Sequence, residues 1–380
     1  MKKLAVCGVA VLVAIAMCGL SLAAAIPLIF DDDGSPDAVI ALLYLLRSQD
    51  RPNHMYDVVA VTVCNGEANP TTRDYAQHLA QLLSDVGHGD IPVAAGRDLP
   101  LARNAEFTAY TNIFPAEWRM GVNSFWGKSP KGWDSQALDP LKAHRLIAKI
   151  LRTSKAPVTI LATGPLTNIA KALEETDRVH WSKINEIVIM GGALSHSGNI
   201  AQAPKGDRRD PPYPDNKVAE WNFWVDSLAA YEVFHSGIKI RLVPLDVTDH
   251  IVWEKLDALK WGTATPEARW ARTMLHIMLD EAGRSLAYAW DLDTAVIACN
   301  PVMFPGVPYL WLDVETRVRN SMGEYIQGQV TTTHLPANAR SRFHETPNVH
   351  VVSLGNPESM YLVGLVKSAV SRAFCDLWMI

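Results

Sequence analysis

The chain has 380 residues, of which 48% are hydrophobic, and it carries 35 Lys and Arg against 40 Asp and Glu, a formal net charge of -5. A slightly acidic chain without a Lys/Arg-rich run is poorly suited to a phosphate backbone, so we expect no nucleic-acid partner. The length fits one large α/β domain or two smaller ones.

The first 25 residues have the pattern of an export signal. Two lysines near the start are followed by the nearly apolar stretch Ala5–Leu20, and Ala23–Ala25 offers small residues for cleavage. A membrane anchor is the competing interpretation, but the stretch is short and lacks a charged stop. We therefore predict a signal peptide over 1–25, one domain over 26–380, a periplasmic or secreted location, and no stable membrane anchor after cleavage.

Beyond that segment, short apolar runs alternate with segments whose apolar residues recur at helical spacing. The expected strands are Ile26–Phe30, Val58–Cys64, Val158–Ala162, Ile187–Met190 and Ile238–Val243. The expected helices are Ala38–Arg47, Thr72–Val86, Leu141–Arg152 and Asn168–Glu175, with another opening at Thr265-Pro266-Glu267. Alternation of helices with apolar strands predicts an α/β fold, in which helices cover both faces of a mainly parallel sheet.

Polar or flexible residues follow several of these strands. In an open α/β sheet, ligands bind outside the carboxyl ends of the strands. The residues expected at this edge are Asp31–Asp33, Asn65, Thr163 and Gly191–Gly192. Two segments, 104–131 and 195–216, are long for plain connections, so we expect them to help form a site there.

The stretch FDDDGSPDA places Asp31–Asp33 and Asp37 close together. One interpretation is a solvated turn with Asp37 as a helix N-cap, but this accounts for Asp37 alone. A second is an aspartate nucleophile for phosphoryl transfer, of the haloacid-dehalogenase type. The matching acidic motif would be GDRRD at 206–210, which lies in a polar loop with no apolar run before it. A third is a divalent cation that neutralises the carboxylates, and oxygen ligands suit Ca²⁺ or Mg²⁺.

Further motifs favour the third interpretation. They are IPVAAGRDLPL (91–101), ATGPLTNIA (162–170), VIMGGA (188–193), AEWNFWVD (219–226) and AWDLDTA (289–295). Together with the N-terminal aspartates, and in this order, they closely resemble the nucleoside hydrolase family over nearly the whole chain beyond the signal. The resemblance implies a Rossmann-like fold and a calcium-dependent N-ribohydrolase, which cleaves the N-glycosidic bond of ribonucleosides to ribose and free base.

The resemblance also implies a set of metal ligands. Asp33 matches the residue that both binds calcium and takes the proton from the attacking water, and Asp31 matches an outer support. Thr163 matches a ligand that binds through its backbone carbonyl, and Asp291 matches the distal calcium ligand. We expect Ca²⁺ as the cofactor and Asp33 as the catalytic base.

The chain departs from the family pattern beside Asp37. Asp37 matches the first of two aspartates, which holds ribose hydroxyls, and the second, a calcium ligand, falls on Ala38. Either a ligand has been lost, or a one-residue deletion in Gly34–Pro36 brings Asp37 to the metal. A third register would make Asp32 the base. We expect Asp37 to touch the metal, the ribose or both.

The substrate side follows from the same resemblance. The residues that match ribose contacts are Asn65, Asn199, Glu220 and Asn222. Trp118 in FPAEWR resembles a stacking tryptophan of the purine-preferring, inosine-adenosine-guanosine branch. Trp290 stands where the nonspecific branch carries a histidine that acts as general acid. We expect Trp118 and Trp290 to stack on a purine and to stabilise the protonated leaving base by cation–π attraction.

The expected partner is a small-molecule nucleoside. The sequence is also compatible with a homo-oligomer. The main alternative from another class is an exported, non-catalytic protein that binds nucleosides or ribose, with a metal site disabled by the change at Ala38. The presence of bound calcium would favour the enzyme. Tight ribose binding in the presence of chelator would favour the binding protein.

Overall fold

The computed structural model describes residues 24–66, 71–101, 137–200, 215–281, 286–304, 306, 309–332, 348–353 and 360–374. Most of the expected signal peptide, the segment 104–131 with Trp118, and residues 201–214 with the GDRRD motif lie outside these ranges. The signal-peptide boundary and the extent of the domain therefore stay predictions.

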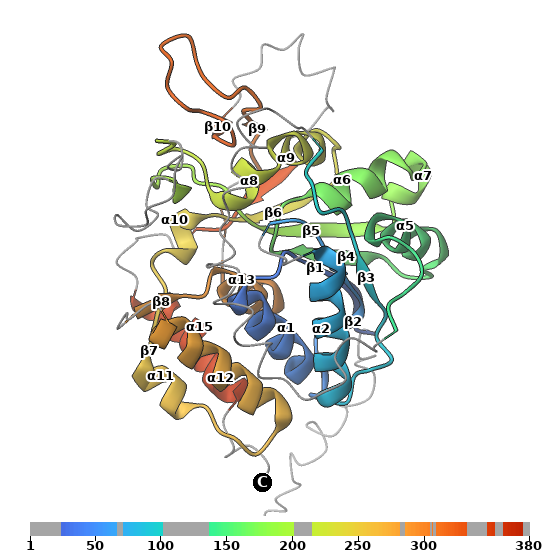
Figure 1. Cartoon of the computed structure of the whole chain (residues 1–380), viewed down its shortest axis with the longest axis vertical. Coiled ribbons are helices and arrows are strands. Elements are labelled where there is room, and N and C mark those ends of the chain that lie inside the picture. Colours follow the sequence, from blue (N-terminus) through green and yellow to red (C-terminus); the bar gives the residue numbers. More distant parts are fainter. Residues whose placement is uncertain are drawn as a thin grey trace, which may run out of the picture.

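A seven-stranded sheet forms the centre of the fold, in the order β11-β6-β5-β4-β1-β2-β3 (Figure 1). Its strands are β1 (Ile26–Asp32), β2 (Tyr56–Val63), β3 (Val93–Ala95), β4 (Val158–Ala162), β5 (Ile184–Met190), β6 (Ile240–Val243) and β11 (Val349–Val351). All neighbouring strands in this sheet pair in parallel. The predicted α/β fold with a mainly parallel central sheet is confirmed.

Helices cover both faces of the sheet, as Figure 1 shows. One face carries α1 (Pro36–Gln49), α2 (Thr72–Asp85), α12 (Pro266–Glu281), α13 (Trp290–Cys299) and α15 (Met360–Phe374). The other carries α5 (Ala143–Thr153), α6 (Thr167–Glu174) and α9 (Ser227–Phe234). Side chains alternate along β1, so Leu28 and Phe30 enter the first core and Ile29 enters the second.

Shorter elements complete the described part of the chain. The helices are α7 (Arg178–Trp181), α8 (Trp221–Val225), α10 (Leu245–Thr248) and α11 (Lys255–Lys260). Two antiparallel pairs join β7 (Val252–Glu254) to β8 (Leu286–Tyr288) and β9 (Leu312–Val314) to β10 (Val330–Thr332). Of the helices within the described ranges, none combines the length and the hydropathy that a membrane span requires.

Helix α1 begins directly after the aspartates of β1. Ser35 is its N-cap, because its side chain accepts a hydrogen bond from the Ala38 amide at 3.1 Å, and Pro36 occupies the first turn. Asp37 lies two residues after Ser35, so the interpretation of Asp37 as the helix N-cap is wrong. The helix is buried from Asp37 to Leu46, which fixes its first turn against the carboxyl edge of the sheet.

Candidate active site

Three consecutive aspartates lie at the carboxyl end of β1. Asp31 and Asp32 are its last residues, Asp33 follows, and their exposed fractions are 0%, 0% and 2%. A solvated turn would leave these carboxylates in water, so that interpretation is wrong. Successive side chains of a strand point to opposite faces of the sheet, and the Asp31 and Asp32 carboxylates therefore have different neighbours.

The Asp31 carboxylate lies on the side of α6. Its Oδ1 accepts hydrogen bonds from the Thr62 hydroxyl at 2.6 Å and the Asn168 amide at 2.9 Å. Its Oδ2 is buried and has no hydrogen-bond partner among the described residues. Burial raises the pKa of Asp31 to about 7. The backbone carbonyl of Asp31 also accepts from the Thr163 amide at 2.9 Å, which ties the ends of β1 and β4 together.

The Asp32 carboxylate is turned toward α2 instead. Its Oδ1 accepts from the Gly34 amide at 2.8 Å, and its Oδ2 accepts from the Tyr75 hydroxyl at 3.2 Å. Burial raises the pKa of Asp32 to about 7 as well. Because both of its oxygens are held by protein groups, the placement of Asp32 is that of a structural carboxylate.

Asp33 lies between the backbones that follow β2 and β4. A Cβ added at Gly66 would lie 2.5 Å from Asp33 Oδ2, and one added at Gly164 would lie 2.4 Å from Asp33 Cβ. Both positions therefore need glycine, and Gly66 also has a positive φ of 137°. The Ser35 amide donates to Asp33 Oδ1 at 3.3 Å. This placement puts the Asp33 carboxylate at the centre of the carboxyl edge.

Two more carboxylates, Asp37 and Asp291, close the group from α1 and α13. The Ser35 hydroxyl donates to Asp291 Oδ2 at 2.7 Å, and the Asp291 amide donates to Asp37 Oδ2 at 3.1 Å. Burial raises the pKa of both residues. The charges of Asp37 and Asp33 raise the pKa of Asp291 further. Carboxylates 254 residues apart in the sequence are thus brought together where they repel one another.

The Thr163 carbonyl lies at the end of β4 beside this group. It accepts a hydrogen bond from the Asn222 side-chain amide at 3.1 Å, and the same amide lies 3.2 Å from the Met190 carbonyl. Asn222 therefore links the ends of β4 and β5 through its nitrogen. Its Oδ1 is the side-chain atom that can accept a hydrogen bond from a ligand.

The residues present fit a hard divalent cation. The oxygen donors gathered here are the carboxylates of Asp33, Asp37 and Asp291 and the carbonyl of Thr163. Buried, closely placed carboxylates are stabilised in their charged form by a cation, and an all-oxygen donor set suits Ca²⁺ or Mg²⁺. Ala38 is fully buried in the hydrophobic core, so its position supplies no ligand, and Asp37 is the acidic residue of α1 that remains.

Glu220, an expected ribose contact, is the N-cap of α8. Its Oε1 accepts from the Asn222 amide at 2.8 Å, and its Oε2 accepts from the Gly192 amide at 3.0 Å and the Phe223 amide at 3.3 Å. Burial raises the pKa of Glu220 to about 7. The carboxylate therefore holds the glycine turn after β5 against α8, in addition to any contact with a ligand.

The pKa of Glu220 predicts a pH-dependent stability. Folding raises this pKa from 4.5 to about 7, so its stabilising contribution is complete below pH 4.5 and is lost as the pH rises through about 7. We expect the Tm of the metal-free protein to fall less steeply between about pH 5 and 8 in Glu220→Gln than in the unmodified protein. Glu232→Gln, at an exposed position on α9, is the matched control. Parallel curves for all three proteins would contradict the prediction.

Two expected ribose contacts carry unsatisfied amide oxygens. Asn65 donates from Nδ2 to the Thr167 hydroxyl at 2.8 Å, and its Oδ1 is buried without a hydrogen-bond partner among the described residues. Asn199 is held by its backbone amide, which donates to the Ala219 carbonyl at 3.1 Å, and its buried Oδ1 likewise lacks a described partner. A buried acceptor left unpaired is costly, and a ribose hydroxyl can donate to it.

Of the two expected base-stacking tryptophans, only Trp290 falls within the described residues, because Trp118 lies in the range 102–136. The Trp290 indole donates from Nε1 to Asp249 Oδ1 at 2.6 Å. Its ring is parallel to that of Tyr288, with centroids 5.6 Å apart. Trp290 therefore lies between the Tyr288 ring and the buried side chains of Met190, Ala193 and Leu245, against which it packs.

Several supporting residues were missed by the sequence analysis. The Thr167 hydroxyl, which accepts from Asn65, donates to Asp226 Oδ2 at 2.5 Å, and Asp226 Oδ2 also accepts from the Leu101 amide at 2.8 Å. Asp226 ends the AEWNFWVD motif, so its place in that motif was an available signal. Asp249 and His196, beside Trp290, carried no local signal, because their proximity arises only from the fold.

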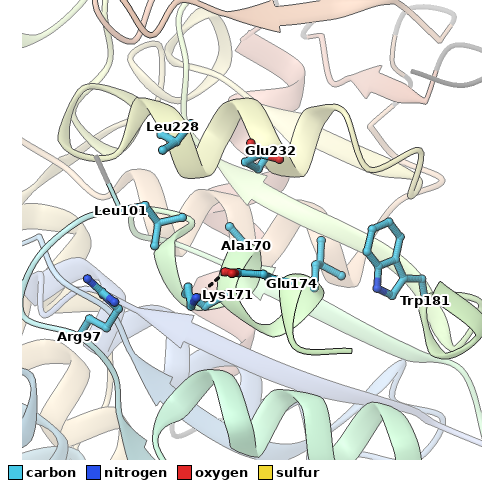
Figure 2. A pocket seen from close by; sticks show the side chains of 9 residues that line it. Arg97, Leu101, Ala170, Lys171, Glu174, Trp181, Leu228 and Glu232 are labelled. Carbon is cyan, nitrogen blue, oxygen red and sulfur yellow. Dashed lines mark hydrogen bonds and ion pairs between the residues drawn. The ribbon is translucent and has the colours of Figure 1, made fainter. Parts of the chain in front are cut away.

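Two other features lie outside this site. A cavity of about 540 Å³ lies between α6 and α9, where Arg97, Lys171, Glu174, Trp181 and Glu232 line it and Lys171 pairs with Glu174 (Figure 2). At the other end of α1, three side chains that could hold a metal ion bring their ligand atoms within 4.8 Å of one another: Asp50, His88 and Glu267. Neither group includes a carboxylate of the active-site cluster.

Two solved nucleoside hydrolases share this architecture. The purine-preferring ribonucleoside hydrolase from Gardnerella vaginalis aligns with a TM-score of 0.69 at 18% identity, covering 91% of this chain and 98% of that one. The inosine-uridine preferring nucleoside hydrolase from Bacillus anthracis aligns with a TM-score of 0.65 at 20% identity, covering 91% and 99%. At these identities the likeness shows the fold.

The sequence itself shows the family. Pyrimidine-specific ribonucleoside hydrolase RihA of Citrobacter koseri is 32% identical over 317 residues, covering 82% of this chain and 89% of the relative. RihA of Photobacterium profundum is 30% identical over 326 residues, covering 83% and 93%. The family model for inosine-uridine preferring nucleoside hydrolases matches residues 28–361, and the chain belongs to this family. It is a hydrolase that acts on the N-glycosyl bonds of nucleosides.

Proposed function

We propose that the chain is an exported, calcium-dependent N-ribohydrolase that prefers purine nucleosides. The observation that carries the metal dependence is the buried group of Asp33, Asp37 and Asp291. A cation would offset the charges of Asp33 and Asp37 that raise the pKa of Asp291. Its site lies at the carboxyl edge of the sheet, where ligands bind in open α/β folds. Residues 1–25, in which two lysines precede an apolar stretch, support export to the periplasm or the medium.

Asp33, Asp37, Asp291 and the Thr163 carbonyl would hold the calcium ion, which when bound would make a water molecule more acidic and neutralise the carboxylates. Asp33 accepts a proton from that water as it adds to C1′, and the bond from C1′ to the base breaks. Asp37 and the amide oxygens of Asn65, Asn199 and Asn222 orient the ribose, with Glu220 holding the turn beside them. Contacts that strengthen as the sugar distorts favour the transition state over the bound substrate.

Trp290 supports the purine preference. A purine presents a wider π face than a pyrimidine and can accept a proton at N7, so stacking on Trp290 stabilises a departing purine more. Trp118, the second tryptophan of the proposed pair, would cover the other face of the base. Pyrimidine cleavage is the second candidate, and the similarity to pyrimidine-specific relatives favours it.

A hydrolysis screen tests the preference. We expect inosine, guanosine and adenosine to be cleaved with a higher kcat/KM than uridine and cytidine, and chelator to suppress all five reactions. Trp290→Ala should lower kcat more than it raises KM, because the stacking contact strengthens as the base gains positive charge. Uridine turnover equal to that of inosine would contradict the purine preference. Tight ribose binding in chelator without any hydrolysis would favour the non-catalytic binding protein.

A further inference from the structure

A histidine–carboxylate pair lies beside Trp290. His196 Nδ1 is 3.6 Å from Asp249 Oδ2, and the other oxygen of Asp249 accepts the Trp290 indole proton at 2.6 Å. Trp290 directly precedes Asp291 in α13, and His196 lies three residues before Asn199. Asp249 therefore links His196, which is near Asn199 in the sequence, to Trp290, which is next to Asp291.

The fold holds His196 firmly in this place. The backbone amides of Leu194, Ser195 and His196 all donate to the Asp246 carboxylate, at 2.8, 2.7 and 3.1 Å. Asp246 belongs to α10, which begins where the amide of Leu245 donates to the Gly192 carbonyl at 2.9 Å. The segment that carries His196 is thus clamped to α10 at four backbone positions.

The hydrogen bonds of His196 indicate which ring nitrogen can exchange a proton. Its Nδ1 lies 2.7 Å from the Ser197 carbonyl, and a carbonyl oxygen only accepts, so Nδ1 carries a hydrogen. Nε2 has no hydrogen-bond partner among the described residues, and the side chain is 27% exposed. Nε2 is therefore the nitrogen that can take a proton from solvent and pass it to a ligand.

Two carboxylates and a second histidine surround His196. Asp249 faces His196 from the end of α10, and Asp246 holds its backbone from the same helix. His250 approaches edge-on, with ring centroids 6.1 Å apart and planes at 84°. Asp249 and Asp246 are thus the acidic groups that face His196, and His250 is the basic group beside it.

We propose that His196, oriented by Asp249, donates a proton to the leaving base when the N-glycosyl bond breaks. This rests on the proposed ribohydrolase function. The C1′–N electron pair goes to the base nitrogen, and the imidazolium gives that base its proton. Water supplies the hydroxyl to C1′ and its proton to Asp33, and solvent then restores both groups. The Trp290 indole proton is already donated to Asp249, so His196 is better placed to supply one.

The test uses two substrates that differ in their need for an acid. A nucleoside base leaves poorly as an anion, whereas p-nitrophenolate leaves without protonation. In His196→Gln we expect kcat for inosine and uridine to fall ~10²–10⁴-fold, the range typical of general acid loss. Hydrolysis of p-nitrophenyl β-D-ribofuranoside should change by less than about threefold, because that reaction makes no use of the acid.

Two further variants control the interpretation. Asp249→Asn keeps the indole contact through an amide oxygen but removes the charge, and it should lower nucleoside turnover selectively and by less than His196→Gln does. His180→Gln, on the remote helix α7, should leave both substrates unaffected. Retained hydrolysis of the p-nitrophenyl riboside also reports that each variant is folded.

The possible outcomes are distinct. A selective loss on nucleosides supports the proposal. An equal loss on both substrates assigns His196 a structural role and overturns it, and so does unchanged nucleoside turnover in His196→Gln. If the unmodified protein hydrolyses neither inosine, uridine nor the p-nitrophenyl riboside, the ribohydrolase function itself fails, and the inference about His196 falls with it.

Discussion

Asp33→Asn should lower kcat by ~10²–10⁴-fold while the protein remains folded, because the amide cannot accept the proton of the attacking water. The change preserves the size of the side chain, which matters where Gly66 and Gly164 pack against it. Steady-state kinetics on the best nucleoside, with the Tm measured in parallel, checks the prediction. The weakened metal site adds to the loss, so this range is a lower bound.

Asp32→Asn is the matched comparison for the register of the aspartates. Its oxygens accept from the Gly34 amide and the Tyr75 hydroxyl, so we expect that variant to lose stability more than catalysis. The loss of an acceptor from a buried hydrogen bond typically costs about 1–3 kcal/mol. If Asp32→Asn abolishes turnover and Asp33→Asn is mild, the register is displaced by one residue and Asp32 is the base.

Removal of calcium should have a comparable effect. Chelator should lower kcat/KM by ~10²–10⁴-fold, because the water then lacks the metal that supports its deprotonation, and added Ca²⁺ should restore activity. Asp291→Asn should raise the calcium concentration needed for half-maximal activity. Asp85→Asn, at an exposed position on α2, should leave that concentration unchanged.

Metal analysis of the purified protein accompanies these assays. We expect about one Ca²⁺ per chain, bound by the one cluster of carboxylates that we describe at the carboxyl edge of the sheet. Full activity in a metal-free preparation would refute the role of the cation. If activity depends on a different divalent ion, the proposed metal site is still supported and only the identity of the bound ion changes.

The secondary structure was largely predictable, because most residues of the central strands are apolar. The predicted Val158–Ala162 coincides with β4, and the other four predicted strands overlap β1, β2, β5 and β6. The strands that were missed, such as β3 (Val93–Ala95) and β11 (Val349–Val351), have only three residues each. Runs this short carry no periodicity, and their pairing is decided by the neighbouring strand.

The active-site cluster was predictable to a different degree. Strand ends placed Asp31–Asp33 and Thr163 at one edge, as parallel topology requires, and the family resemblance added Asp291. The contacts of Asp249 with His196 and Trp290 could not be predicted from local sequence. These residues lie on three separate segments, and only the packing of α10 and α13 brings them together.

The alternation of side chains along β1 has a consequence for how this protein can vary. Asp31 is anchored beneath α6 by Thr62 and Asn168, Asp32 is anchored beside α2 by Tyr75, and Asp33 emerges between two glycines. The three aspartates of the triplet therefore have different surroundings, although the residues are identical. Inserting or deleting one residue in β1 would leave the three consecutive aspartates unchanged in sequence. It would, however, move each carboxylate to the opposite face of the sheet. A change in the length of this strand is therefore more damaging than most substitutions within it. Transferring the three aspartates to another protein would require the same alternation of side chains between the two faces of the strand, as well as the same residues.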